Sequence, residues 1–144
     1  MPSMTPVARI ARVLLADDHA EMLAQTRSVL AGTFDVISTV TNGMDLIMAT
    51  ALLDPDVVVL DITMPDFDGI EAARRLGRGG CRAKFVFLSV HEDPDYVRGA
   101  LHAGGMAYVV KPRLASDLIT AINEALAGRS FVSPLRDPTV ARKC

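Results

Sequence analysis

The sequence predicts a doubly wound α/β fold, in which a five-stranded parallel sheet is covered by helices on both faces. Short apolar runs alternate with longer amphipathic segments along the chain, which is typical of repeated strand and helix units. The short runs are rich in Val, Ile, Leu and Phe, as expected of strands that are buried on both faces. At 144 residues, of which 50% are hydrophobic and 22% charged, the chain has the size and composition of one globular domain.

Each of the five predicted strands is followed by a predicted helix. The predicted strands are residues 12–16, 34–40, 57–60, 84–89 and 107–110. The predicted helices are residues 19–31, 44–53, 70–78, 94–103 and 116–127. In the last helix, apolar residues recur on one face, Ser116 is placed to cap the start and Gly128 to end it. We expect the domain to span residues 8–131, with a flexible leader at 1–7 and a tail or truncated linker at 132–144.

Composition excludes several classes of protein. A net charge of −2 gives no general attraction to nucleic acid. Cys81 and Cys144 form no CxxC pair and no zinc-ligand spacing, so they indicate only a reducing compartment. No apolar run approaches the ~18 residues that a membrane span needs. We therefore predict a cytoplasmic protein that does not contact the membrane.

Polar side chains stand where four of the predicted strands end. Asp17 and Asp18 follow the first strand, Asp61 follows the third, Ser89 ends the fourth and Lys111 follows the fifth. Ligands bind at this edge of an open parallel sheet. If the strand order is 2-1-3-4-5, the crevice lies between the first and third strands, where the three aspartates converge.

Each of these residues also has a purely structural explanation. Asp18 suits a helix cap, Asp61 a turn, Ser89 a hydroxyl turn, and Lys111 simply precedes a proline. Taken singly, the structural explanation is favoured each time. Taken together, at neighbouring strand ends, the residues favour a functional site.

Three neighbouring carboxylates repel one another. At ~4 Å and an effective dielectric near 20, each like-charged contact costs on the order of 4 kcal/mol, so the cluster must bind protons or a cation. Carboxylate oxygens suit Mg²⁺, with Mn²⁺ as an alternative. The three histidines lack ligand spacing and are expected to be surface or structural residues: His19, His91 and His102.

This set of groups is suited to phosphoryl transfer, in which positioning and charge neutralisation do most of the catalysis. Asp61 is the candidate phosphoryl acceptor. Asp17 and Asp18 would hold the metal directly or through water, and Lys111 would balance charge on the phosphoryl group. Ser89 could donate a hydrogen bond to a phosphoryl oxygen.

Four ordered motifs resemble the receiver domain of bacterial two-component response regulators: VLLADDH, VVVLDITMPDFDGIEA, FVFLSVHED and AGGMAYVVKP. The resemblance covers most of the chain and implies a flavodoxin-like fold with strand order 2-1-3-4-5. It also implies that Asp61 is the phosphoacceptor and Lys111 the invariant lysine. The implied metal ligands are Asp17, Asp18, Asp61 and the backbone carbonyl of Thr63.

The same resemblance assigns roles to residues around the acceptor. Ser89 is similar to the switch hydroxyl, and Tyr108 to the aromatic residue that moves inward on activation, although an aromatic residue in a strand more often just packs. The peptide bond before Pro112 is often cis in this family. Thr63, Val90 and His91 resemble positions that tune phosphorylation. Val90 and Ala107 depart from the usual pattern, because many receivers have a smaller residue at the first position and glycine at the second.

The segment SVHEDPDYVRGALHAGG, with GRSFVSP after the last helix, resembles receivers of the LuxR/NarL type. Their helix-turn-helix domain is absent, so we expect a stand-alone receiver or one cut from a longer transcription factor, with no direct nucleic-acid binding by this chain. The implied partner is a sensor histidine kinase. The implied output surface is the fourth helix, fifth strand and fifth helix, which also allows a homodimer.

Two other functions fit parts of the pattern. A phosphatase of the haloacid dehalogenase type would also use Asp61, but it needs an aspartate where Thr63 stands. A flavodoxin-like cofactor binder would offer amides and hydroxyls to a phosphate, which the Asp17-Asp18 pair would repel. The resemblance instead implies a signalling domain that catalyses only its own phosphorylation and dephosphorylation. A degenerate receiver is disfavoured, since every catalytic position is filled.

Overall fold

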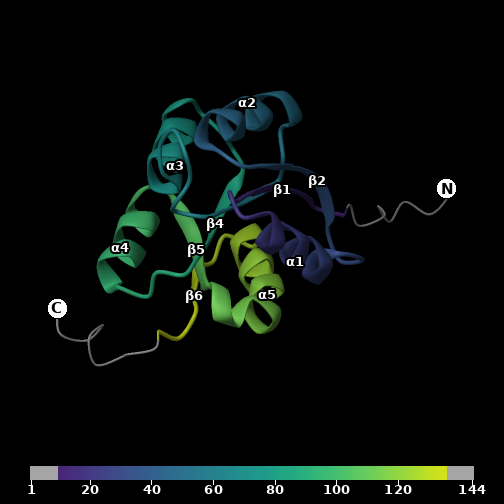
Figure 1. Ribbon diagram of the computed structural model, residues 1–144, viewed down its shortest axis with the longest axis vertical. Coiled ribbons are helices and arrows are strands. Elements are labelled where there is room, and N and C mark those ends of the chain that lie inside the picture. Colours follow the sequence, from purple (N-terminus) through teal and green to yellow (C-terminus); the bar gives the residue numbers. More distant parts are fainter. Residues whose placement is uncertain (1–9, 136–144) are drawn as a thin grey trace.

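The computed structural model describes residues 10–135 (Figure 1). Its centre is a six-stranded sheet in the order β2-β1-β3-β4-β5-β6, in which every neighbouring pair is parallel. The strands are β1 (Arg12–Ala16), β2 (Asp35–Val40), β3 (Val57–Leu60), β4 (Lys84–Ser89), β5 (Gly105–Val110) and β6 (Phe131–Val132). The predicted fold class and the order of the first five strands are confirmed.

Five α-helices cover the sheet on both faces (Figure 1). Those whose buried side chains share one core are α2 (Gly43–Leu53), α3 (Gly69–Arg78) and α4 (Pro94–His102). On the other face, α1 (Ala20–Leu30) and α5 (Leu114–Leu126) enclose a second core. A short 3₁₀ turn, η1 (Lys111–Arg113), connects β5 to α5.

The VVVL run of β3 explains why a strand so apolar can lie in the middle of the sheet. Val57 and Val59 point into the core beneath α1 and α5, whereas Val58 and Leu60 point into the core beneath α2, α3 and α4. Successive residues of a strand face opposite sides of the sheet. Since helices cover both sides, all four side chains are buried. The strand is thereby fixed on both faces at the point where the chain reaches Asp61.

The sixth strand is a correction to the predicted five-stranded sheet. β6 pairs with β5, placing Phe131 beside Ala107 and Val132 beside Tyr108. A two-residue apolar run is too short to be recognised from periodicity. β6 spans the point at which we predicted the domain to give way to a tail, and that boundary stays a prediction. The predicted leader, and the tail beyond residue 135, lie outside the described residues.

The start of α5 also differs from the prediction. The helix begins at Leu114, with Arg113 at the N-cap, so Ser116 lies inside the first turn and does not cap it. The Ser116 hydroxyl instead lies 3.2 Å from the Arg113 carbonyl oxygen. The predicted stop at Gly128 is confirmed, because this glycine, which follows the C-cap residue Ala127, has a φ of +80°.

No cis peptide bond occurs in residues 10–135, so the bond before Pro112 is trans.

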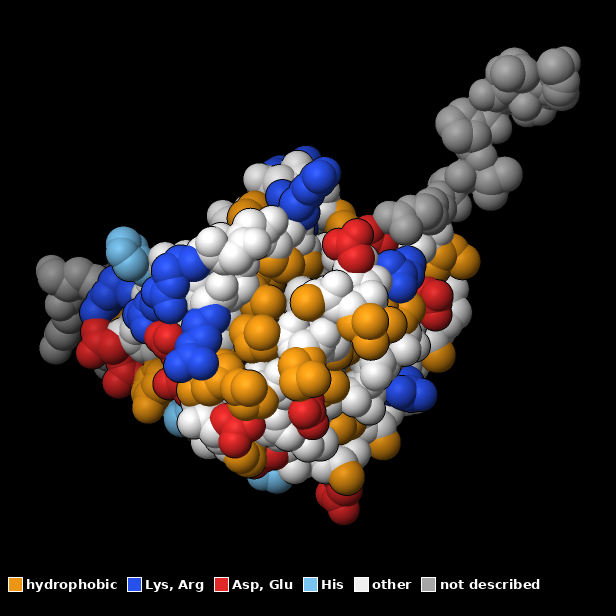
Figure 2. Space-filling model, turned by 90° about the horizontal axis from the view of Figure 1, so that it is seen from above, with side chains coloured by type: hydrophobic (Ala, Val, Ile, Leu, Met, Phe, Trp, Pro, Cys, Tyr) orange, Lys and Arg blue, Asp and Glu red, His pale blue; other side chains and the backbone are white. Residues whose placement is uncertain are grey.

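The outer surface of α2 is unusually apolar. Met44, Met48 and Leu52 are 49%, 64% and 83% exposed and recur every four residues, which places them on one stripe of the helix. Figure 2, seen from the α2 side, shows hydrophobic side chains gathered in the middle of this face beside a row of basic ones.

Among the described helices, none is both long and apolar enough to cross a membrane.

Candidate functional site

Two neighbouring strands bring the three predicted aspartates to one edge of the sheet. The backbone N–H of Asp61 donates to the carbonyl of Ala16 (2.9 Å), and that of Asp17 donates to the carbonyl of Val40 (3.1 Å). Both bonds continue the strand pairing one residue beyond the strands. Asp17 and Asp61 are each only 4% exposed, whereas Asp18 is exposed. The backbone therefore holds two buried carboxylates side by side.

Gly69 allows the loop after Asp61 to fold back against it. The N–H of Gly69 donates to the carbonyl of Ile62 (2.7 Å), and this closes the loop where α3 begins. A Cβ atom at residue 69 would lie 2.0 Å from the backbone carbonyl oxygen of Asp61, which no side chain can tolerate. The glycine of the MPDFDG segment is thus required for the backbone around Asp61, a constraint that sequence reasoning missed.

Lys111 joins the two buried carboxylates. Its Nζ atom lies 2.8 Å from Asp17 Oδ2 and 3.1 Å from Asp61 Oδ2, and its side chain is only 7% exposed. Burial alone would lower the pKa of Lys111, but its close contact with Asp17 and the charge of Asp61 outweigh burial and raise this pKa. Lys111 therefore remains a cation at the predicted position.

The negative charge of Asp61 is only partly balanced by the groups around it. Burial raises its pKa above the ordinary aspartate value, and the charge of Asp17 adds to this effect. Lys111, and a 2.7 Å hydrogen bond from the Ile62 N–H to Asp61 Oδ1, act in the opposite direction without cancelling it. The carboxylate of Asp61 would consequently gain from an additional positive charge nearby.

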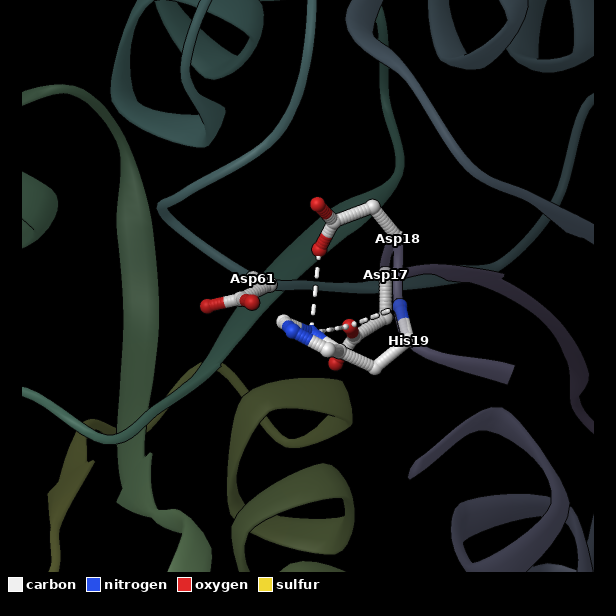
Figure 3. Close-up of side chains that lie close together, drawn as sticks. All are labelled: Asp17, Asp18, His19 and Asp61. Carbon is white, nitrogen blue, oxygen red and sulfur yellow. Dashed lines mark hydrogen bonds and ion pairs between the residues drawn. The ribbon is translucent and has the colours of Figure 1, made fainter. Parts of the chain in front are cut away.

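The arrangement around the aspartates fits a hard divalent cation. Ligand atoms of Asp17, Asp18, His19 and Asp61 all lie within 4.8 Å of one another (Figure 3). Despite its short distance to Lys111, the buried Asp17 Oδ2 atom accepts no well-aligned hydrogen bond from the described residues. A set of carboxylate oxygens with such an atom among them matches the ligands that Mg²⁺ and Mn²⁺ prefer.

His19 is the unexpected member of this group. Its side chain is 67% exposed, as predicted for a surface histidine. However, its Nδ1 atom lies 3.2 Å from Asp17 Oδ1 and 3.0 Å from Asp18 Oδ1. Sequence reasoning missed these contacts because it considered histidines spaced as a pair, and not one adjacent to two aspartates.

Ser89 and Tyr108 meet at the backbone of His91. The His91 N–H donates to Ser89 Oγ (3.1 Å), and the Tyr108 hydroxyl donates to the His91 carbonyl (2.7 Å). Ser89 and Tyr108 are fully buried. Burial is the main cause that raises the pKa of Tyr108 to about 12, so its phenol stays neutral. The structure thus brings both predicted switch residues to the loop after β4.

The side chain of His91 contacts residues of two other segments. Its ring stacks on Tyr96, with 4.1 Å between ring centroids, and its Nε2 atom lies 3.2 Å from the hydroxyl of Thr63. Two of the predicted tuning residues therefore contact each other across the site, and sequence reasoning missed Tyr96. The third, Val90, is 63% exposed.

Comparison with known proteins finds relatives over most of the chain. The family model of the response regulator receiver domain matches residues 13–123. The nitrate/nitrite response regulator protein NarL of Escherichia coli K12 is 30% identical over 133 residues, which are 91% of this chain and 62% of NarL. The chemotaxis protein CheY of Bacillus subtilis is 32% identical over 116 residues, covering 80% of this chain and 97% of CheY.

Some relatives are longer than this chain. It spans 62% of the transcriptional regulatory protein YvfU of Bacillus subtilis (33% identical) and 53% of DegU of Brevibacillus brevis (30% identical). Among solved structures, a LuxR-family two-component response regulator from Aurantimonas superposes with a TM-score of 0.84 at 28% identity, covering 94% of this chain and 95% of that one.

These similarities decide between the functions considered from the sequence. The haloacid dehalogenase alternative is not supported, since the curated relatives and the LuxR-family structure described above are response regulators or chemotaxis receivers. The receiver family model covers most of the described residues and includes all three aspartates and Lys111. The chain therefore belongs to the response regulator receiver domain family of two-component signal transduction.

Proposed function

We propose that Asp61 accepts a phosphoryl group from a sensor histidine kinase and that this event switches the output surface of the domain. One observation carries the proposal: a buried lysine, Lys111, lies between Asp17 and Asp61 at the edge of the sheet. A buried cation at this position is costly to maintain for stability alone. It is well placed to neutralise the charge that a phosphoryl group would bring to Asp61.

The acceptor's two oxygens have different surroundings. Oδ1 is fixed by the Ile62 N–H and Oδ2 by Lys111. In the proposed transfer, one carboxylate oxygen of Asp61 forms a bond to phosphorus while the bond from phosphorus to the donor nitrogen breaks, and its electron pair stays with that nitrogen. The rigid backbone of Asp61 favours the in-line approach that this displacement needs.

A divalent cation belongs to the proposed reaction. Asp17, Asp18 and Asp61 would hold it, together with the backbone carbonyl of Thr63. When bound, Mg²⁺ or Mn²⁺ supplies positive charge that offsets the carboxylates and the phosphoryl oxygens. Lys111, which contacts both Asp17 and Asp61, would contribute further positive charge.

The switch is proposed to run from Ser89 to Tyr108. The hydroxyl of Ser89 would donate to a phosphoryl oxygen, which competes with the contacts it makes in the loop after β4. Tyr108 is linked to this loop through the His91 carbonyl, so a shift of the loop would reach β5. The face formed by α4, β5 and α5 is the proposed output and homodimer surface.

The proposed activity is confined to the domain itself. It would catalyse its own phosphorylation and dephosphorylation and would turn over no other substrate. His91 and Thr63, in contact across the site, would slow the approach of water to the aspartyl phosphate, and Val90 would limit access for the phosphodonor. We expect the protein to act in the cytoplasm, without direct contact to nucleic acid by this chain.

Intact-mass spectrometry after incubation with Mg²⁺ and acetyl phosphate tests the proposal. The wild-type protein should gain one phosphoryl group, and Asp61→Asn should gain none. Asp66→Asn is the matched control, because Asp66 is an exposed aspartate of the same loop, and this variant should react like the wild type. An unmodified wild-type protein, or an equal adduct on Asp61→Asn, would contradict the assignment.

A further inference from the structure

We propose that His19 is a nitrogen ligand of the metal site, so that this domain binds nitrogen-preferring divalent metals such as Ni²⁺ and Co²⁺ much more tightly than an all-oxygen site would. The inference rests on the proposed metal site and adds a ligand to it. It concerns a residue to which the proposed phosphoryl chemistry gives no role.

The position of the imidazole carries the first step. His19 directly follows the two aspartates, and Figure 3 shows its ring extending from β1 toward Asp61, beside both of them. Nδ1 lies 3.0 Å from Asp18 Oδ1 and 3.2 Å from Asp17 Oδ1. A ring nitrogen so close to two carboxylates belongs to the same potential coordination sphere.

The distances agree with coordination as well as with hydrogen bonding. In an octahedral site with ligands about 2.1 Å from the metal, neighbouring ligand atoms are about 3.0 Å apart. The separations of Nδ1 from its two carboxylate oxygens are of this size. A metal could therefore take Nδ1 and either of these oxygens as adjacent ligands with little movement of the side chains.

The backbone supports this position of the ring. The His19 N–H donates to Asp17 Oδ1 (2.9 Å), and His19 stands at the N-cap of α1 without capping it through its side chain. The side chain is thus not needed to hold the helix. Its ring is also largely exposed, so a metal can reach it from solvent.

The kind of metal follows from the donor set. Oxygen ligands alone suit Mg²⁺ and Mn²⁺, whereas an imidazole favours Ni²⁺, Co²⁺ and related ions. Mg²⁺ binds imidazole poorly and keeps several water ligands, so it should be held by the aspartates and be almost indifferent to His19. The histidine should affect the choice of metal and leave Mg²⁺ binding nearly unchanged.

Calorimetric titration of the untagged full chain with Mg²⁺ and with Ni²⁺ tests this inference. His19→Asn should weaken Ni²⁺ binding by about tenfold or more and change Mg²⁺ binding by less than about threefold. Asparagine is a good N-cap residue, so this variant should fold. His102→Asn is the matched control, because His102 is an exposed histidine on α4, and it should leave both affinities unchanged.

A second measurement separates this site from any other. Mg²⁺ should displace Ni²⁺ competitively from the wild-type protein, and Asp17→Asn should lose the displaceable fraction. Line broadening of the His19 ring signals by Ni²⁺, in NMR spectra of the wild type, should appear at the same metal concentrations. These results together would support His19 as a ligand.

Three results would overturn the inference. Equal affinities of His19→Asn and wild type for Ni²⁺ would remove His19 from the site while leaving the proposed function intact. Tighter binding of both metals to His19→Asn would show that the histidine acts as a competing counter-ion. If the wild type bound neither metal, the proposed metal site itself would fail.

Discussion

Two buried aspartates in this domain, Asp61 and Asp117, have similar exposure, but their pKa values are shifted in opposite directions. They are 4% and 6% exposed, and each is paired with a basic residue. Burial raises the pKa of Asp61. The hydrogen bond from Arg113 is the largest cause that lowers the pKa of Asp117. Similar exposure therefore does not give similar pKa values: the effect of burial dominates at Asp61, whereas the hydrogen bonds of its partners outweigh burial at Asp117.

Asp117 has every partner that a buried carboxylate requires. Arg113 contacts both of its oxygens, with Nε 2.7 Å from Oδ2 and Nη2 3.2 Å from Oδ1. The Ser133 hydroxyl, just after β6, donates to Oδ2 at 2.7 Å. This network ties α5 to the end of β6.

Asp61, by contrast, shares its lysine with Asp17 and lies beside that second carboxylate. The comparison shows how a carboxylate with a structural role differs from the proposed phosphoacceptor. Asp117 is saturated with hydrogen bonds, whereas Asp61 is left short of positive charge, which a bound cation could supply.

The largest effect is expected from Gly69→Ala, which pushes on the backbone of Asp61. The added Cβ would collide with the Asp61 carbonyl oxygen, so we expect a loss of about 3 kcal/mol in the free energy of unfolding. Gly77→Ala is the matched control in the same helix, because a Cβ there meets nothing within 4 Å. It should gain about 0.5 kcal/mol from helix propensity. Urea denaturation followed by circular dichroism measures both, and equal effects would refute the role given to Gly69.

The second-largest loss of stability is expected from removing the carboxylate of Asp117. Asp117→Ala leaves the Ser133 hydroxyl and Arg113 without their partner, so unfolding should become easier by about 2 kcal/mol. The same denaturation experiment measures it. Ser133→Ala should lose about 1 kcal/mol, because it removes the hydrogen bond to Asp117 and the longer one (3.3 Å) that Ser133 Oγ accepts from the Val110 N–H, while Asp117 keeps Arg113. An Asp117→Ala variant as stable as wild type would break the contrast with Asp61.

Neutralising Asp61 should increase the free energy of unfolding, whereas removing Asp117 should decrease it. Asp61→Asn removes a buried charge that lacks compensation, and Lys111 keeps Asp17, so we expect a gain of roughly 1 kcal/mol at pH 7 without metal. Mg²⁺ should stabilise the wild type and leave Asp61→Asn nearly unchanged. Thermal denaturation with and without Mg²⁺ tests this, and a destabilised Asp61→Asn variant would contradict it.

The smallest effect is expected in how the stability contributions of Asp61 and Asp117 change with pH. A raised pKa makes the folded state hold its Asp61 proton longer, so wild-type stability falls as pH rises from about 4 through the folded pKa. The advantage of Asp61→Asn should therefore be full at pH 7 and vanish below about pH 4. Asp117 has a lowered pKa, so its contribution is present above about pH 4 and lost as pH falls through its folded pKa. Denaturation curves across this range should show these opposite trends.

The central part of the fold and the site could be predicted from the sequence because it depends on local patterns. Apolar runs locate β1, β3 and β4 with their observed bounds. Since parallel strands end at one edge, the residues after them had to converge. The convergence of Asp17, Asp61 and Lys111 follows once the strand order 2-1-3-4-5, which the family resemblance implied, is added to the order of the chain.

The remainder depends on contacts between distant parts of the chain. β6 is only two residues long, and Ser133 lies 16 positions from Asp117, so no local pattern reveals either pairing. The constraint on Gly69 comes from the backbone of Asp61, and the stacking of His91 on Tyr96 depends on how α4 is placed. These features require three-dimensional coordinates.

The most direct test of the contrast is an NMR titration of the two side-chain carboxyl carbons, of Asp61 and Asp117, in the metal-free protein. We predict that the pKa of Asp61 lies above the ordinary aspartate value of about 3.9 and that of Asp117 lies below it. Added Mg²⁺ should lower the pKa of Asp61 and leave that of Asp117 unchanged. A pKa of Asp61 at or below that of Asp117 in the metal-free protein would contradict the account.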